Sequence, residues 1–201
     1  DGDSWGGDCI VNIIDNEAYY GGGIYTALYP ILDSLIIDNV KIQNNKSSKG
    51  SGIYMNGAPL CQMRNINIQN NGGSISLFAR NFSGTITDGL IVDNIEEQRL
   101  IVFENCSMPI IENVSMISNG GVGIYVDLHS ECENGLTPEI TIKNSIIWSS
   151  NDDFRSIDEH YSNNHYPIIS YSNIKGDTIW SGEGNINQNP MFMGGGDFSL
   201  Q

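Results

Sequence analysis

The sequence predicts an all-β protein folded as a solenoid, that is, a stack of similar turns of chain. Its apolar residues come in short runs, and none keeps helical spacing for more than about two turns. Seven asparagines recur in one apolar setting, at intervals of 19 to 31 residues. Glycines precede a second recurring set of apolar pairs. These repeats predict about seven coils in a single domain that covers residues 1–201.

The first recurring element is a strand interrupted by an asparagine. The seven asparagines are Asn12 in CIVNII, Asn39 in LIIDNVKI, Asn65 in QMRNINI, Asn94 in LIVDNIEE, Asn113 in IIENVSMI, Asn144 in ITIKNSII and Asn173 in ISYSNIKG. Apolar residues stand two positions before and one position after most of them, as Ile37 and Val40 do around Asn39. A strand alternates at period 2, so this change of phase predicts a bend at the asparagine. Asparagine tolerates left-handed backbone angles, and stacked amides can bond to one another, so we expect a ladder of asparagine corners.

The second element is a strand that follows a glycine-rich turn. Its recurring pairs are Ile24-Tyr25, Ile53-Tyr54, Ile75-Ser76, Ile101-Val102 and Ile124-Tyr125. Glycine before most of these pairs lets the backbone turn through positive φ. Residues 1–8 are expected to form an acidic leader and residues 177–201 a closing coil. Because the end coils of a solenoid need caps, we expect the chain to be a segment of a longer protein.

The charge balance excludes several classes of partner. The chain has 24 Asp+Glu against 9 Lys+Arg and a formal charge of −15. Nucleic acids and anionic membranes need clustered basic residues, so neither is expected to bind. No stretch approaches the roughly 20 apolar residues of a membrane-spanning helix. The sequence predicts no cofactor, and Ca²⁺ is the cation that its acidic residues would suit.

Two groups of motifs carry a resemblance to a known family. GGGIY followed by LIIDNVKIQNN is similar to the glycine-rich and asparagine-containing repeats of surface β-helix proteins and autotransporter passengers. ITIKNSIIWSSN, IISYSNIKG and GEGNINQNPMFMGGGDFSLQ look like the closing coils of many secreted bacterial β-helix proteins. Over most of residues 9–201 the chain therefore resembles the right-handed parallel β-helix of the pectate-lyase-like superfamily. That superfamily includes lyases, hydrolases, adhesins and scaffolds, so the resemblance implies a fold and leaves the activity open.

Three outward residues form a candidate catalytic group. Asp38 and Asp93 each precede a predicted corner, and Arg64 holds the same position between them. Lyases and hydrolases of the resembled fold place acids and a basic residue on an outer face, where a base removes a sugar-ring proton and Ca²⁺ neutralises the uronate. The alternative is that charges of alternating sign relieve repulsion between adjacent parallel strands. An arginine between two aspartates is what this alternative predicts.

Tyrosines on the second strand form a candidate carbohydrate site. Tyr25 and Tyr54 are expected on adjacent coils, with Tyr125 further along the same column. Stacked aromatic rings can form a platform for sugar rings, although tyrosine is also favoured in strands for packing alone.

Two acidic segments are candidate metal sites. Asp1, Asp3 and Asp8 lie in a glycine-rich start whose oxygen atoms suit Ca²⁺, and a solvated acidic leader has the same composition. The stretch 152–165 combines carboxylates with His160 and His165, in a spacing that matches no familiar metal motif.

The four cysteines have no metal-type spacing. The coil register makes Cys106 and Cys132 the candidate disulfide, because they fall on neighbouring coils. Cys61 occupies an apolar column and is expected in the core. Cys9 falls one position off that column, two coils from Cys61, which argues against pairing these two.

Regular repeats without a convergent polar cluster predict a non-catalytic, extracellular or cell-surface module with a structural or adhesive role. The alternatives are a polysaccharide lyase or glycoside hydrolase of the resembled fold, and a carbohydrate-binding module. Other protein domains, of the same or a neighbouring chain, and glycans are the expected partners.

Overall fold

The computed structural model describes residues 10–27, 34–57, 60–92, 94, 99–118, 121–128, 139–149, 157–161, 167–194 and 197–200, which contain no helix. The first sheet contains β1 (Val11–Ile14), β3 (Leu35–Gln43), β5 (Cys61–Gln69), β7 (Thr85–Val92), β9 (Ile110–Ser118), β11 (Thr141–Lys143), β12 (Ile146–Ser149), β14 (Ile168–Ser170) and β15 (Asn173–Ile174). The second sheet contains β2 (Ile24–Ala27), β4 (Ile53–Asn56), β6 (Ile75–Arg80), β8 (Arg99–Glu104), β10 (Val122–Leu128) and β13 (Ile157–Tyr161).

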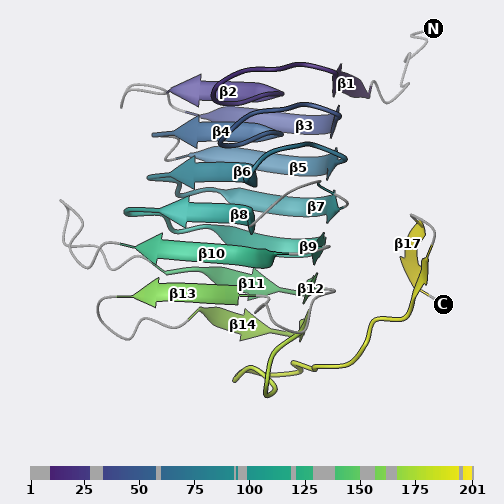
Figure 1. Ribbon diagram of the computed structural model, residues 1–201. Helices are drawn as coiled ribbons and strands as arrows, with labels where there is room; N and C mark the ends of the chain where they lie inside the picture. The colour runs from purple at the N-terminus through teal and green to yellow at the C-terminus, as the bar shows by residue number, and fades with distance from the viewer. Residues whose placement is uncertain are drawn as a thin grey trace, which may run out of the picture.

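The two sheets are the two long sides of a parallel β-solenoid, as the sequence predicted. Each strand pairs in parallel with the equivalent strand one turn later, for example β3 with β5 and β4 with β6. In Figure 1 the strands of the nearer sheet run to the left and those of the farther sheet to the right while the chain descends, so the winding is right-handed. About five turns form the body of the stack, fewer than the seven predicted. The end turns have only short strands, with four residues in β1 and two in β15.

The core lies between the two sheets and is continuous along the stack. Inward positions of successive turns lie over one another and are 0% exposed; they include Ile42, Ile68, Ile91, Met116 and Ile147 in the first sheet and Ile53, Leu77, Ile101 and Ile124 in the second. Successive turns are about 4.8 Å apart, so each inward side chain fills the space directly over its neighbour. Shortening one of them would therefore leave a cavity that the turns above and below cannot fill.

The strands of the first sheet bend in the middle, where the change of apolar phase predicted it. Ile37 and Val40 are both buried on either side of Asn39, which has φ 54°. The corner column, as we call it, consists of the positive-φ residues that the strand register aligns with Asn39: Asn65, Asp88, Asn113, Asn144 and Tyr171. The left-handed conformation lets the chain turn at the corner while the side chains before and after it, such as Ile37 and Val40, both point into the core.

Three of the seven predicted corner asparagines lie elsewhere, so the prediction was wrong for Asn12, Asn94 and Asn173. Asn12 pairs with Lys41 and Asn173 with Ile146, each two positions beyond the corner. Asn94 belongs to a different column, and Asp88 holds the corner of its turn. Apolar neighbours on both sides made these asparagines look like corners in the sequence. The short interval of 19 residues before Asn113 came from the choice of Asn94 instead of Asp88.

A second set of asparagines forms the amide ladder that was expected at the corners. This rung ladder consists of Asn16, Asn45, Asn71 and Asn94, one on each of four successive turns. The backbone N–H and the Nδ2 of each rung donate to the Oδ1 of the next, at 2.9 to 3.1 Å. Each Nδ2 from Asn45 onward also donates back to a carbonyl of the preceding turn, as Asn45 does to Ile13 at 2.9 Å. Asn45 and Asn71 are fully buried, and these bonds satisfy their amides.

Glycine is required at the turn that leads into the second sheet. Gly21 and Gly50 occupy equivalent positions of the first two turns, with φ of 62° and 65°. A Cβ on Gly21 would lie 2.6 Å from the carbonyl oxygen of Ile24. Other residues are therefore excluded by both conformation and space.

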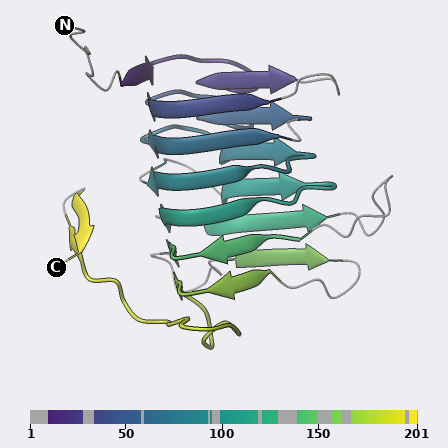
Figure 2. The same ribbon diagram turned by 180° about the vertical axis from the view of Figure 1, so that it is seen from behind.

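The two ends of the stack differ. After β15, the chain turns back so that Glu183, Asn185 and Ile186 bond to the exposed edge of the first sheet's last strands. Asn185 accepts from the N–H of Ser172 at 3.1 Å and donates to the carbonyl of Ile169 at 3.0 Å. Figures 1 and 2 show the following segment leaving the stack and running back alongside it. Within the expected closing coil, β16 (Phe192–Gly194) and β17 (Asp197–Leu200) form an antiparallel pair rather than another turn.

Candidate functional site

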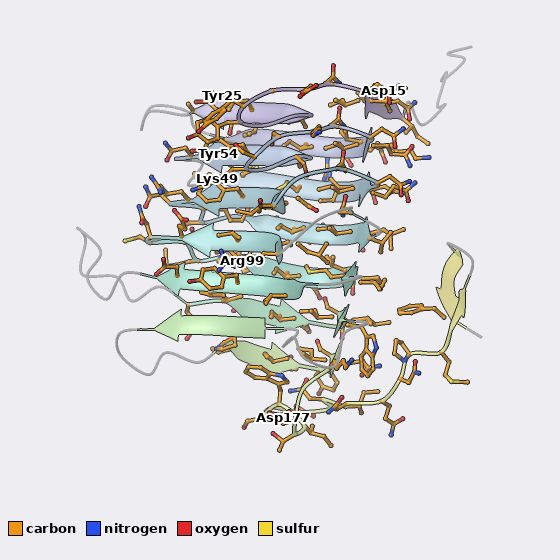
Figure 3. All side chains as sticks on the ribbon, viewed as in Figure 1. Asp15, Tyr25, Lys49, Tyr54, Arg99 and Asp177 are labelled. Carbon is orange, nitrogen blue, oxygen red and sulfur yellow. The ribbon has the colours of Figure 1, made fainter. Side chains whose placement is uncertain are left out.

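The strongest candidate site lies on the outer face of the second sheet. The strand register places Tyr25, Tyr54, Phe78, Val102 and Tyr125 in one outward column, one residue on each of five turns. Tyr25 and Tyr54 are on adjacent turns and Tyr125 is further along, as the sequence predicted. Figure 3 shows Tyr25, Tyr54 and Lys49 together on this face, with Arg99 further down.

The aromatic rings at the N-terminal end of this column stack on one another. The centroids of Tyr25 and Tyr54 are 5.3 Å apart with planes at 9°, and those of Tyr54 and Phe78 are 4.9 Å apart at 12°. Tyr20 packs beside Tyr54 at 5.1 Å. These four residues, Tyr20, Tyr25, Tyr54 and Phe78, form what we call the aromatic face. Parallel rings in contact are about 3.5 Å apart, so these centroid separations indicate an offset stack.

Exposure decreases along the aromatic face. Tyr25 is 55% exposed, Tyr54 is half-buried, and Phe78 is fully buried in a small apolar cluster with Ile75 and Val102. The accessible part of the face is therefore its N-terminal end. There, Tyr25 and Tyr20 are exposed and Tyr54 is partly exposed.

Basic side chains surround these rings in a chain that has few of them. The Nζ of Lys49 lies 4.9 Å from the ring centroid of Phe78, and the guanidinium of Arg80 lies 5.8 Å from it. The guanidinium carbon of Arg99 lies over the ring of Tyr125, 3.7 Å from its centroid. Arg80 also binds Glu104, with an Nη2–Oε2 distance of 2.5 Å, whereas no carboxylate among the described residues pairs with Lys49. Of the two cations that lie over the ring of Phe78, Lys49 is thus the one that no carboxylate of the described residues pairs with.

The titration of the site follows from its packing. Burial raises the pKa of Tyr54, and burial followed by the neighbouring Tyr19 raises the pKa of Tyr20. The hydrogen bond that the Arg80 guanidinium donates to Glu104 raises the pKa of Arg80. At neutral pH, the phenols are therefore neutral groups that can both donate and accept hydrogen bonds, beside a permanent cation.

The candidate catalytic residues form an ion pair in the structure. The Nε of Arg64 lies 2.9 Å from one carboxylate oxygen of Asp38, and the amide of Asn65 donates to the other at 3.0 Å. Both oxygens of Asp38 are therefore engaged on an exposed surface. Asp93, the third candidate, lies outside the described residues.

A similar ion pair recurs further along the same outward column. Lys143 lies over Glu112, with an Nζ–Oε1 distance of 3.6 Å. Charges of opposite sign thus face each other on adjacent parallel strands at two places, which lowers repulsion in the stack. The geometry around Asp38 and Arg64 matches this structural role.

Most of the predicted metal ligands lie outside the described residues. This applies to Asp1, Asp3 and Asp8 and to the side chains of the stretch 152–165. Within the part of the chain that the structure describes, no three His, Cys, Asp or Glu side chains are grouped as a metal site.

The cysteines are placed only in part. Cys61 is buried in the core column, as expected, and burial raises its pKa to about 12. Cys106 follows β8, whereas Cys132 and Cys9 lie outside the described residues, so the disulfide Cys106–Cys132 stays a prediction.

The sequence alone missed part of the aromatic face. Ile75-Ser76 looked equivalent to Ile53-Tyr54, but the register aligns Tyr54 with Phe78, two residues later. A signal was available, because Leu77-Phe78 repeats the aliphatic–aromatic order of the other turns. Tyr20 and Lys49 lie in the turns before the strands, and nothing in the pattern indicated that they reach the rings.

No protein-family model, no curated protein and no solved structure matches this chain. Its parallel solenoid is consistent with the pectate-lyase-like resemblance, which no homologue establishes. Among the described residues, no helix is long and apolar enough to cross a membrane.

Proposed function

We propose that this chain is a non-catalytic, extracellular β-solenoid module that serves as a rigid adhesive element and contacts glycans through the aromatic face. The observation that carries the proposal is the stack of the exposed Tyr25 on the half-buried Tyr54, next to Lys49, which no carboxylate of the described residues pairs with. The solenoid holds this surface on a rigid, regular scaffold.

The shape of the aromatic face suits an extended polysaccharide. An offset stack leaves part of each ring uncovered, and C–H groups of a sugar pack well on such surfaces. Of the stacked rings, those of Tyr25 and Tyr54 are accessible, and their centroids lie 5.3 Å apart along the stack of turns. Neutral phenols and Lys49 supply hydrogen bonds and a positive charge at the edge. We therefore expect a glycan that carries carboxylate or sulfate groups, aligned with the solenoid axis.

The outer face of the first sheet supports a non-catalytic role. A general base must be free to accept a proton, and Asp38 already accepts hydrogen bonds from Arg64 and Asn65. The competing function is a polysaccharide lyase or glycoside hydrolase. Incubation with acidic polysaccharides and measurement of unsaturated-uronate absorbance and reducing ends tests it; turnover would replace the proposal with this enzyme function.

Glycan binding is tested by array and sedimentation assays with the wild-type chain. We expect binding to an acidic polysaccharide, reduced at least about tenfold by Tyr25→Ala and by Tyr54→Ala, since each removes a ring worth over a kcal/mol. Lys49→Gln should weaken binding to acidic but not neutral polymers. Tyr171→Asn is the matched control, because it removes an exposed tyrosine at a corner position that asparagine accepts. Equal binding by all four variants would contradict the aromatic face as the site.

The extracellular location has its own test. A disulfide between Cys106 and Cys132 would require an oxidising compartment. Mass spectrometry of the natural, non-reduced protein should find these two cysteines in one linked peptide pair. Two free thiols at these positions would argue against secretion.

A further inference from the structure

Arg99 is a further cation that lies over an aromatic ring on the outer face of the second sheet, two turns beyond Lys49. We propose that Arg99, held over Tyr125, is a second anion-binding subsite, and that one polyanionic glycan chain spans from it to the aromatic face. Because this subsite extends the aromatic face, it rests on the proposed glycan binding. It adds the path of the glycan, a second point of contact and a minimum length of ligand.

The two cations are placed by the same arrangement of neighbouring turns. Lys49 precedes β4, and its Nζ lies over Phe78 of β6, the next strand of the sheet. Arg99 begins β8, and its guanidinium lies over Tyr125 of β10, again the next strand. Each cation therefore comes from near the start of one strand and is held by a ring of the following turn. This contact fixes in place a charge that would otherwise move on a long side chain.

The geometry of Arg99 suits an anion. Its Cζ lies 3.7 Å from the ring centroid of Tyr125, which is van der Waals contact. A guanidinium nitrogen is about 1.3 Å from Cζ, so a group standing on its edge would overlap the ring. The guanidinium therefore lies with its face on the ring and its N–H donors along its edge, where a carboxylate or sulfate can accept two of them. Among the described residues, carboxylates pair with Arg64, Arg80 and Lys143, and Arg99 is in none of these pairs.

The distribution of charge gives the path of the ligand. Successive turns are about 4.8 Å apart, so Lys49 and Arg99 are separated by about 10 Å along the stack. Both lie on the side where the chain enters the strands of the second sheet. Glu104 and its register partner Asp127 lie at the other ends of these strands, roughly 16 Å from the level of Arg99. In a chain of formal charge −15, a polyanion is therefore attracted along the strand starts and repelled from the strand ends.

This path sets what the glycan must carry. One anionic group binds Lys49, beside the rings of Tyr25 and Tyr54, and another group about 10 Å further along binds Arg99. A ligand that is too short to reach both cations makes only the first contact. Once the ligand spans the two, the second contact becomes intramolecular, so the affinity rises steeply with chain length.

Calorimetric titration of the full chain with oligosaccharides of graded length tests the second subsite. Heparin di-, tetra-, hexa- and octasaccharides supply sulfate together with carboxylate, and hyaluronan oligosaccharides of the same lengths supply carboxylate alone. We expect the Kd to fall by about tenfold or more once an oligosaccharide spans both cations, and the series that shows this gain identifies the anionic group. Arg99→Gln should remove the gain and leave the Kd of the shortest oligosaccharide unchanged. Arg99→Lys, which keeps the charge but not the paired donors, should retain part of it.

Arg64→Gln is the matched control, because it makes the same change of charge in an exposed ion pair on the other sheet. Urea denaturation checks that each variant is folded. Suppose that Tyr25→Ala weakens binding but Arg99→Gln does not, or that the Kd has no step with length. Either result would overturn the second subsite and leave the proposed glycan binding intact. Equal effects of Arg99→Gln and Arg64→Gln would also overturn it, since long-range attraction would explain both. If neither series binds the wild-type chain, both proposals fail.

Discussion

Two columns of asparagines run along the same stack, and they have different structural roles. In the corner column, Asn65 and Asn113 are exposed, have positive φ and donate to the carboxylates of Asp38 and Asp88. In the rung ladder, Asn45 and Asn71 are fully buried and bond to the turns on both sides. Asparagine is thus favoured in the corner column by its backbone conformation, and in the rung ladder by the hydrogen bonds of its side chain.

Residue types vary along the corner column. In the rung ladder, by contrast, all four turns have asparagine. Asp88 and Tyr171 replace asparagine at corners and keep positive φ, at 54° and 50°. A corner requires only a residue that can adopt this conformation. A rung requires a buried donor and a buried acceptor in one short side chain, which asparagine supplies.

The largest effect is expected from Asn71→Ala. It removes the donor that bonds to the carbonyl of Ile42 and the acceptor that bonds to the backbone N–H of Asn45 in the interior, at a cost of about 3 kcal/mol in the free energy of unfolding. Urea denaturation measures this cost. Asn67→Ala, a change on the outer face of β5, the strand before this rung, is the control and should cost far less. Equal costs for the two variants would refute the distinction between rung and surface.

Buried and exposed positions should also differ in their response to alkaline pH. The pKa of Cys61 is raised from 9.0 to about 12 in the folded chain, so between these values the unfolded chain releases a proton that the folded chain keeps. Stability is therefore lost as pH rises from about 9 to 12, with a slope of up to about 1.4 kcal/mol per pH unit from this group. Cys61→Ala, measured by urea denaturation over this range, should be less stable at pH 8 and have a shallower slope. Parallel curves for the two proteins would contradict the assignment.

At the corners, the identity of the new residue should matter more than the loss of the amide. Asn65→Ala is expected to lower the free energy of unfolding by about 1 kcal/mol, because the left-handed conformation at φ 51° is unfavourable for alanine. Asn65→Gly should cost less, since glycine adopts this conformation freely. The difference between the two urea midpoints isolates the backbone contribution. A glycine variant as unstable as the alanine variant would show that the bond to Asp38 dominates instead.

The smallest effect is expected from the surface ion pair. Arg64→Ala removes the partner of Asp38, but both side chains are partly exposed, so the cost should stay below about 1 kcal/mol and shrink further in high salt. Thermal denaturation at low and high salt measures it. A loss of several kcal/mol would mean that this pair has a role beyond charge compensation.

Much of the fold was predictable because stacking imposes a repeat on the sequence. The parallel solenoid, the bend at Asn39 and Asn65, the burial of Cys61 and the alignment of Tyr25 with Tyr54 all follow from apolar columns that recur once per turn. The errors arose where the period drifts. The prediction placed Asn94 at the corner that Asp88 occupies, and it placed Ser76 in the outward column at the position that Phe78 occupies.

The sequence by itself determined the class of fold, since inward positions must be apolar on every turn and this leaves a readable period. Only the tertiary structure decided which asparagine of each adjacent pair turns the chain and which enters the interior. Asn44 and Asn70 have positive φ, whereas Asn45 and Asn71 are buried rungs. The two members of a pair are chemically identical, and only a partner 23 to 29 residues away in the neighbouring turn distinguishes them. The same holds for Lys49, whose position over Phe78 depends on a contact between turns that no local pattern encodes.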